Sequence, residues 1–352
     1  MNDKLRIGFV GVGTMGQCAH LRNYAALPDM CEVVAIAELR PELASQVAAR
    51  YGVPTVYSSH AEMIRQEQLD ALVVSQPFTR HGSLLPELLA AGIPIFTEKP
   101  IAGSLAMGEA VAAAGAASGT LHMLGYHKRS DPATMAAKAE ILRLQASGEL
   151  GPLKYVRLTM PAGDWITGGF NDLIRSEEPL PAVAWDPPDA TLSAEDYGVY
   201  TSFVNYYIHQ VNLLRHMLGE PYAVSHVDPT GVLLVGRSES GVPCTIEMTP
   251  YRTTVDWQES ALVCFERGWV ELQLPAPLAL NRPGRVRFLH DPGQGATPRT
   301  VEPQLPWVHA MRQQAVNFMR AVRGEIAPLT DAAEALEDLR VARQFLTHYK
   351  GV

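Results

Sequence analysis

A glycine-rich turn between a predicted strand and a predicted helix constrains the fold of this 352-residue chain most strongly. Gly11, Gly13 and Gly16 fit G-x-G-x-x-G, with Thr14 and Met15 inside the pattern, directly after the apolar run 5–10. A helical pattern continues to about Leu27, and a second predicted strand over 32–37 leads into the acidic residue Glu38. This spacing predicts a βαβ unit in which backbone N–H groups meet a dinucleotide pyrophosphate and Glu38 binds the ribose. The alternative is a structural turn with a solvated Glu38.

The alternation of short apolar runs and helical patterns continues beyond this unit. The expected elements are a strand over 71–75, a helix over 81–91 closed by Gly92, a strand over 93–97, an Ala-rich helix ending near Gly119 and a strand over 120–126. Such alternation is typical of a parallel sheet with helical crossovers. The sequence therefore predicts an N-terminal Rossmann domain over residues 1–125.

The remainder, 126–352, is expected to form a second α/β domain. Asp131 and Pro132 have the pattern of a helix start, and Gly148 and Gly151 that of its end. Further elements are a strand over 153–159, a helix over 200–218, strand-like runs from 222 to 289 and two helices over 306–323 and 330–349. The runs and turns favour a large, mostly antiparallel open sheet, whose bare face predicts a homodimer or homotetramer. Residues 161–197 are long and aperiodic, so we expect them to border a substrate pocket.

The composition limits the binding partners and the cellular location that can be expected. The net charge of −8 provides no attraction for nucleic acid, and no apolar run approaches the length of a membrane span. The N-terminus lacks the pattern of a signal peptide. Four cysteines without metal or disulfide spacing fit a reducing cytoplasm, and no metal site is expected. These features leave a cytoplasmic protein with a small-molecule ligand as the expectation.

A lysine follows the predicted strand over 93–97. Glu98-Lys99-Pro100 lies where open α/β sheets bind ligands, at the carboxyl ends of the strands. A suitably tuned amine there can bind a substrate hydroxyl and move its proton. From the residues alone, a surface lysine is at least as good an interpretation of Lys99. Other residues expected on this rim, toward the cofactor, are Ser75, Gln76, Pro77 and His81, although His81 also suits an ordinary helix start.

Polar residues recur along the predicted helix over 200–218. Asn205, His209 and Asn212 are spaced as one stripe on an otherwise apolar helix. A histidine there can accept the proton of a hydroxyl that is being oxidised. The alternative is a structural His209 hydrogen-bonded to Asn205.

Several motifs together resemble one family. They are the glycine-rich turn, Ser75-Gln76-Pro77 with His81, the run from Ala91 to Glu98-Lys99-Pro100, Gly125 to Arg129, Ser147 to Gly151, and His209 through Pro221. In this order they resemble the glucose-fructose oxidoreductase/inositol dehydrogenase (Gfo/Idh/MocA) family, over nearly the whole chain. The resemblance implies hydride transfer between a nicotinamide and a hydroxyl-bearing carbon of a sugar, cyclitol or related polyol. Some relatives cleave glycosides with no net redox change, and others are non-catalytic dinucleotide and sugar sensors.

The resemblance also implies roles for individual residues. Lys99 is the catalytic lysine, Glu98 helps to position it near the nicotinamide, and His209 is the histidine of a D-x-x-x-H pair in which Asn205 replaces the usual Asp. An amide cannot raise the basicity of a histidine as a carboxylate does. Substrate contacts are expected from Lys128, Asp164, Trp165, Asn205, Tyr206 and His209. For Lys128 a plain salt bridge is an equally good interpretation.

The cofactor is expected to be NAD rather than NADP. A 2′-phosphate would meet the carboxylate of Glu38, and Arg40 is the only nearby cation. Arg40 is therefore a further candidate for contact with the cofactor.

Overall fold

The structure is a computed structural model that describes residues 4–351. It divides into two compact units. The first contains the residues up to Tyr126 together with 168–194 and 314–336, and the second contains 127–167, 195–313 and those from 337 onward. The predicted boundary near residue 125 is therefore only the first point at which the chain passes from one unit to the other. Two later segments, 168–194 and 314–336, belong to the first unit again.

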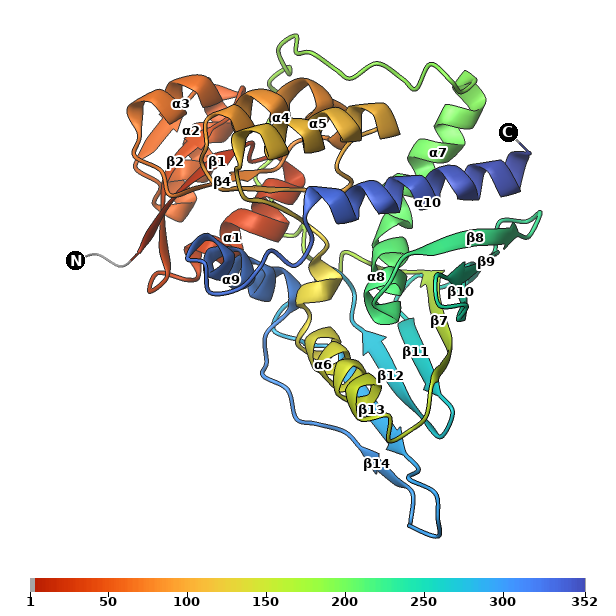
Figure 1. Ribbon diagram of the computed structural model, residues 1–352. Coiled ribbons are helices and arrows are strands. Elements are labelled where there is room, and N and C mark those ends of the chain that lie inside the picture. The colour runs from red at the N-terminus through yellow and green to blue at the C-terminus, as the bar shows by residue number, and fades with distance from the viewer. Residues whose placement is uncertain (1–3, 352) are drawn as a thin grey trace. The chain divides into compact units, whose positions relative to one another are not determined.

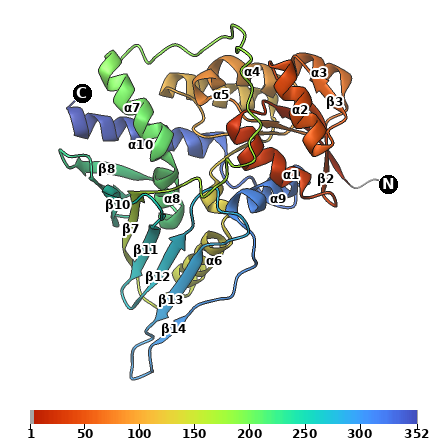
Figure 2. The same cartoon turned by 180° about the vertical axis from the view of Figure 1, so that it is seen from behind.

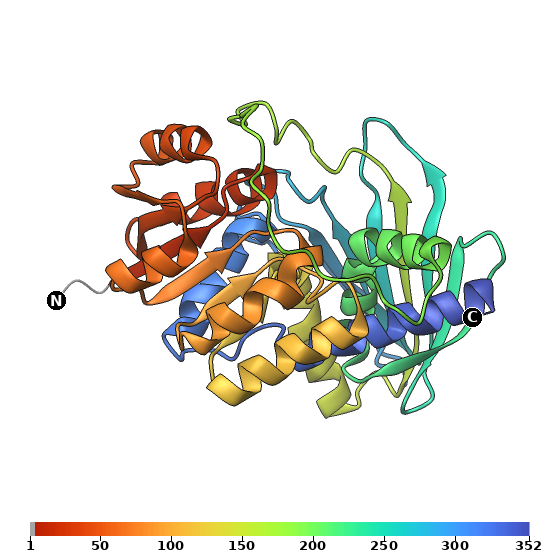
Figure 3. The ribbon, with the colours of Figure 1, turned by 90° about the horizontal axis from the view of Figure 1, so that it is seen from above.

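The first unit is built on a parallel six-stranded sheet in the order β3-β2-β1-β4-β5-β6. Its strands are β1 (Leu5–Val10), β2 (Cys31–Ala37), β3 (Thr55–Tyr57), β4 (Ala71–Val74), β5 (Ile95–Thr97) and β6 (His122–Leu124). The strand order reverses between β1 and β4, which is where doubly wound sheets bind dinucleotides. The predicted Rossmann architecture is confirmed (Figure 3).

Helices cover both faces of this sheet (Figure 1). They are a π-helical segment Gly16–Leu21 continued by α1 (Arg22–Ala25), then α2 (Pro41–Tyr51), α3 (His60–Gln66), α4 (His81–Ala90), α5 (Leu105–Ser118) and α9 (Ala310–Val322). Phe318 of α9 is fully buried with its ring 5.6 Å from that of Phe96, in the same apolar cluster as Phe9 of β1. A segment far along the chain thus completes the core of the first unit.

The second unit contains an eight-stranded sheet in the order β14-β13-β12-β11-β7-β10-β9-β8. Its strands are β7 (Leu153–Ala162), β8 (Tyr222–Val227), β9 (Leu233–Ser238), β10 (Pro243–Arg252), β11 (Glu259–Phe265), β12 (Gly268–Leu274), β13 (Arg285–His290) and β14 (Arg299–Val301). All neighbouring strands are antiparallel except β10 and β7. Buried residues alternate with partly exposed ones along β11, and Figure 2 shows the strands β11 to β14 from their less covered side. The predicted mostly antiparallel open sheet is confirmed.

Helices of the second unit pack against this sheet. The helix α6 (Pro132–Ser147) begins as predicted, because the Asp131 side chain accepts a hydrogen bond from the backbone N–H of Ala133 (2.8 Å), and it ends at Gly148. The chain also contains α7 (Ala194–Tyr206), α8 (Ile208–Leu218) and α10 (Ala332–Lys350).

The prediction of one continuous helix over 200–218 is wrong. The helix is interrupted at Tyr207, which separates α7 from α8. Tyr207 contacts Thr249 of β10 through a hydroxyl–hydroxyl hydrogen bond, a tertiary contact that helical periodicity does not show. Asn205 therefore lies on a different helix from His209 and Asn212.

Candidate active site

The glycine-rich turn of the first unit leaves room for a ligand at one glycine and none at the other two. Gly11 has φ +91°, and a Cβ there would lie 2.2 Å from Gln76 Nε2. A Cβ on Gly16 would lie 2.7 Å from the Gly11 carbonyl oxygen. At Gly13 the nearest atom, Arg40 Nη2, would be 3.7 Å away. The turn thus has the required tight closure and an approachable backbone at Gly13, which fits a dinucleotide pyrophosphate.

Glu38 lies at the end of β2 beside this turn. One of its carboxylate oxygens accepts a hydrogen bond from the backbone N–H of Val12 (3.0 Å), and the other accepts from the backbone N–H (3.2 Å) and Nε (2.8 Å) of Arg40. Glu38 is only 6% exposed. The structure therefore brings Glu38, Arg40 and the turn together, as expected for the ribose-binding end of the site.

The segment after β5 fixes the backbone of Lys99. Glu98 Oε2 accepts a hydrogen bond from the Lys99 backbone N–H (3.1 Å), and Glu98 Oε1 lies 2.5 Å from His20 Nε2. Burial acts to raise the pKa of Glu98, but the contacts with His20 and Lys99 outweigh it and lower that pKa overall. An ionised Glu98 held between His20 and the backbone places Lys99 at the carboxyl end of β5.

His81 is a buried, supporting residue and is not exposed on the rim. It is fully buried, and its Nδ1 lies 3.1 Å from the Pro100 carbonyl oxygen and 3.2 Å from that of Ile101. Burial lowers the pKa of its imidazole. His81 thus holds the loop that follows Lys99 and presents no ring atom to solvent.

The other rim residues lie on the loop after β4. The Ser75 backbone N–H bonds the carbonyl oxygen of Val10, and Gln76 Nε2 lies 3.4 Å from the same oxygen. Gln76 also accepts a hydrogen bond from Arg80 Nη1 (2.8 Å), and Pro77 directly precedes a short helical turn that begins at Phe78. Gln76 and the glycine-rich turn therefore share one edge of the sheet.

In the second unit, Lys128 is held by a buried ion pair. Its ammonium contacts Glu259 Oε2, and both side chains are almost fully buried. Glu259 also accepts hydrogen bonds from Gln210 Nε2 (2.7 Å) and Trp257 Nε1 (3.2 Å), and Lys128 lies over the Trp257 ring at 5.7 Å from its centroid. Of the two readings, substrate contact and salt bridge, the structure shows the salt bridge.

His209 lies near this ion pair within the second unit. Its ring packs edge-on against His127, with centroids 4.6 Å apart, and His127 directly precedes Lys128. Burial, and next the negative charge of Glu259, raise the pKa of the Tyr206 hydroxyl. His209 and Tyr206 thus belong to one polar neighbourhood, whereas Asn205 is exposed on α7.

Asp164 and Asn212 have structural partners. Asp164 Oδ1 accepts the backbone N–H groups of Ile166 and Thr167, each at 3.0 Å, so this carboxylate closes a local turn beside Trp165. Asn212, the third residue of the predicted stripe, is buried and bonds Arg129 and Asp338. The stripe therefore does not act as one polar face.

His20 and Glu259 are absent from the residues singled out in the sequence. His20 lies in the π-helical segment, whose periodicity differs from 3.6, and its partner is 78 residues away. Glu259 begins a strand and shows no motif. Only the tertiary structure brings each of them to its partner.

Neither a metal site nor a membrane span is evident in the described part of the chain. Between residues 4 and 351, no group of three His, Cys, Asp or Glu side chains is arranged to hold a metal ion. Over the same range, no helix combines the length and apolar character that crossing a membrane requires.

Comparison with known proteins shows which proteins this chain is similar to. An inositol 2-dehydrogenase from Acidothermus cellulolyticus is 31% identical over 148 residues, 42% of each chain. A levoglucosan dehydrogenase from Pseudarthrobacter phenanthrenivorans is 26% identical over 237 residues, 65% of this chain and 55% of that one. The matches thus span about half the length of these curated relatives. A solved levoglucosan dehydrogenase in complex with NADH and levoglucosan has the same fold, with TM-score 0.74, 18% identity and coverage of 99% of this chain and 98% of that one.

Residues 5–126 match the model of the oxidoreductase family with an NAD-binding Rossmann fold. The glycine-rich turn and Glu38 are the parts of the structure that suit this cofactor. Over these residues the chain is similar to the Gfo/Idh/MocA oxidoreductases, the family that its motifs also resemble.

Proposed function

We propose that this protein is an NAD-dependent dehydrogenase that transfers hydride between a nicotinamide and a hydroxyl-bearing carbon of a sugar, cyclitol or related polyol. The observation that carries the proposal is the anchoring of Lys99. Glu98, held by His20, fixes the Lys99 backbone at the carboxyl end of β5, on the same sheet edge as the glycine-rich turn. Lys99 thus has a hydrogen-bonded backbone next to the end of β5, which suits the positioning that proton transfer requires.

The chemistry requires a base beside the hydroxyl. When bound, the nicotinamide accepts or supplies the hydride. The Gly13 backbone and Glu38 would hold the pyrophosphate and ribose, and Lys99 would take the hydroxyl proton during oxidation. His209 is proposed as the second proton-transfer group. Lys99 belongs to the first unit and His209 to the second.

Several features support a polyol as the substrate. The relatives named above include an inositol dehydrogenase and a levoglucosan dehydrogenase, whose names refer to polyhydroxy compounds. In the second unit, His209 and Tyr206 carry hydrogen-bonding groups on aromatic rings, and Trp257 adds an aromatic face, which together suit the hydroxyls and C–H faces of a sugar. We also propose a cytoplasmic homo-oligomer. Asp164, Trp165 and Asn205 are proposed to border the substrate, whereas Lys128 acts through its ion pair with Glu259.

A panel of inositols, aldoses and anhydrosugars assayed with NAD⁺ for NADH formation tests the proposal. We expect turnover of at least one polyol, almost complete loss in Lys99→Met, and a loss on the order of 10²-fold in His209→Ala. Affinity for NAD should stay unchanged in both variants. The matched control is Lys154→Met, at an exposed position of β7.

Two other outcomes separate the alternatives. Tight NAD binding with no turnover of any polyol or glycoside would favour a non-catalytic sensor, which the Asn205 replacement also suits. Cleavage of a glycoside without net NADH formation would favour a glycoside-cleaving enzyme. Near-normal kcat in Lys99→Met would remove Lys99 from the mechanism.

A further inference from the structure

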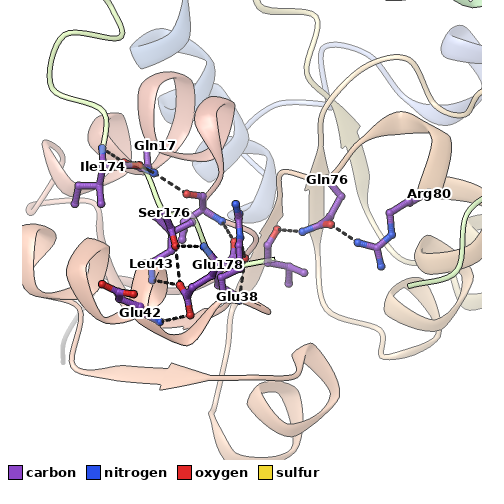
Figure 4. Close-up of polar contacts among 12 residues, drawn as sticks. Gln17, Glu38, Glu42, Leu43, Gln76, Arg80, Ile174, Ser176 and Glu178 are labelled. Atoms are coloured by element: carbon purple, nitrogen blue, oxygen red, sulfur yellow. Dashed lines mark hydrogen bonds and ion pairs between the residues drawn. The ribbon is translucent and has the colours of Figure 1, made fainter. Parts of the chain in front are cut away.

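Residues 171–186, here called the strap, are an aperiodic segment that packs on the first unit. Its first attachment is to Gln17, the residue that follows the last glycine of the glycine-rich turn. Gln17 Nε2 donates to the Ile174 carbonyl oxygen (3.1 Å), and the Ile174 backbone N–H donates to Gln17 Oε1 (3.1 Å) (Figure 4). This reciprocal pair fixes the strap beside the turn that suits the pyrophosphate.

The strap has a second attachment at the start of α4. The buried carboxylate of Asp186 accepts the backbone N–H groups of Gly82 (2.8 Å) and Ser83 (2.7 Å), and also the Ser83 hydroxyl (2.7 Å). The Asp186 backbone N–H bonds the Thr79 carbonyl oxygen (2.8 Å). Both ends of the strap are therefore fixed to the ligand-binding edge of the sheet.

Between these attachments, Glu178 contacts the start of α2. Its two carboxylate oxygens accept the backbone N–H groups of Glu42 (3.0 Å) and Leu43 (2.9 Å), and Ser176 also donates to it (2.8 Å) (Figure 4). Burial acts to raise the pKa of Glu178, but these donors and the positive charge of Arg40 outweigh it and lower that pKa. Glu178 is thus a carboxylate at neutral pH, and it occupies N–H groups that would otherwise suit an anion.

Arg40 lies in the field of two carboxylates. Its Nε is bonded to Glu38, and Glu178 acts on it electrostatically. Its guanidinium also borders the open position at Gly13. One cation with two anions leaves a net negative group at the ribose-binding end of the site. Arg40 Nε and the first N–H groups of α2 already have anionic partners.

We propose that Glu178 is a specificity-determining residue that excludes NADP. A 2′-phosphate on the adenosine ribose needs a cation and hydrogen-bond donors, which an arginine and a helix start commonly supply. Here Glu178 takes the donors of α2 and, with Glu38, offsets the charge of Arg40. In the sequence pattern, Glu38 is the one carboxylate that disfavours NADP. The strap adds the carboxylate of Glu178 with the same effect. This inference rests on the proposed use of NAD.

Binding titrations of NAD⁺ and NADP⁺ to the full chain, without any substrate, test the inference. Glu178→Gln removes the charge and should tighten NADP⁺ binding about fivefold, while NAD⁺ affinity changes less than about twofold. Glu178→Ser also uncovers the α2 N–H groups, so its gain for NADP⁺ should be larger. The matched control is Glu177→Gln, which makes the same charge change at the exposed neighbouring position and should leave the ratio of the two affinities unchanged.

A purely structural role for Glu178 predicts a different result. Asp186→Asn weakens the other attachment of the strap, so it should lower the unfolding temperature without changing the NADP⁺ to NAD⁺ affinity ratio. If Glu178→Gln and Glu178→Ser behave in the same way, with lower stability and an unchanged ratio, the inference is overturned. If the unaltered protein binds neither nucleotide, the proposed function itself fails, and that result is distinct from an unchanged ratio.

Discussion

Replacing His20 tests how the structure positions Lys99. His20 lies 2.5 Å from Glu98, whose side chain is 13% exposed, so solvent can replace little of the lost contact. A hydrogen bond to a charged group contributes about 2 kcal/mol to stability. His20→Leu should therefore lower the free energy of unfolding by about that amount, while His20→Gln, which keeps a donor, should lose less.

The same change should act on catalysis through Lys99. A Glu98 that is no longer held from both sides lets the Lys99 backbone shift, and small misplacements of a reacting group cost about 10- to 100-fold in rate. We expect kcat for the preferred polyol to fall by this factor in His20→Leu and to recover in part in His20→Gln. Affinity for NAD should not change, because the proposed pyrophosphate and ribose contacts are at the glycine-rich turn and Glu38.

The pH dependence of stability gives an independent readout. The lowered pKa of Glu98 means that its ionised form stabilises the fold. That contribution is present above the ordinary value of 4.5 and is lost as the pH falls through the lower value of the folded state. Unfolding measured by denaturant across this range should show less acid sensitivity in His20→Leu. If His20→Leu keeps the stability, acid sensitivity and kcat of the unaltered protein, the contact does not position Lys99, and the reasoning is refuted.

Three further substitutions test the site. Gly16→Ala places a Cβ 2.7 Å from the Gly11 carbonyl oxygen, so it should weaken NAD binding at least tenfold and also lower the unfolding temperature. Gly13→Ala has room for its Cβ and should weaken only NAD binding. Equal losses of stability in the two variants would contradict this interpretation. Glu259→Gln leaves the Lys128 ammonium buried without its counter-charge and should destabilise the fold by about 3 to 5 kcal/mol in denaturant unfolding. An unchanged unfolding curve would show that the pair is not important for stability.

The first unit was largely predictable because its signals are local. The buried strands β1, β2 and β4 are short apolar runs, and the glycine-rich turn has a steric reason for glycine at Gly11 and Gly16. By contrast, no element is predicted above for residues 41–66, where the structure has α2, β3 and α3. β3 is three residues long at the sheet edge and has no fully buried residue, so no hydrophobic pattern announces it.

Features that depend on distant residues were not predictable. Tyr207, at the helix interruption, contacts Thr249, and Glu98 is anchored by His20; each partner is far away in the chain. The predicted link between residues 161–197 and function rested on length and aperiodicity, which cannot show that Glu178 meets the start of α2. Sequence patterns predict Lys99 as the reacting lysine, and only the folded chain shows what holds it.

The discontinuous first unit has a consequence for the order of synthesis and folding. Its core needs Phe318 and Met319, which leave the ribosome long after β6. A fragment ending near residue 125 would carry an uncovered apolar face where α9 belongs, and such surfaces promote aggregation. The Rossmann sheet therefore completes its core only when nearly the whole chain has been made, so a nascent chain stalled before α9 should depend on chaperones.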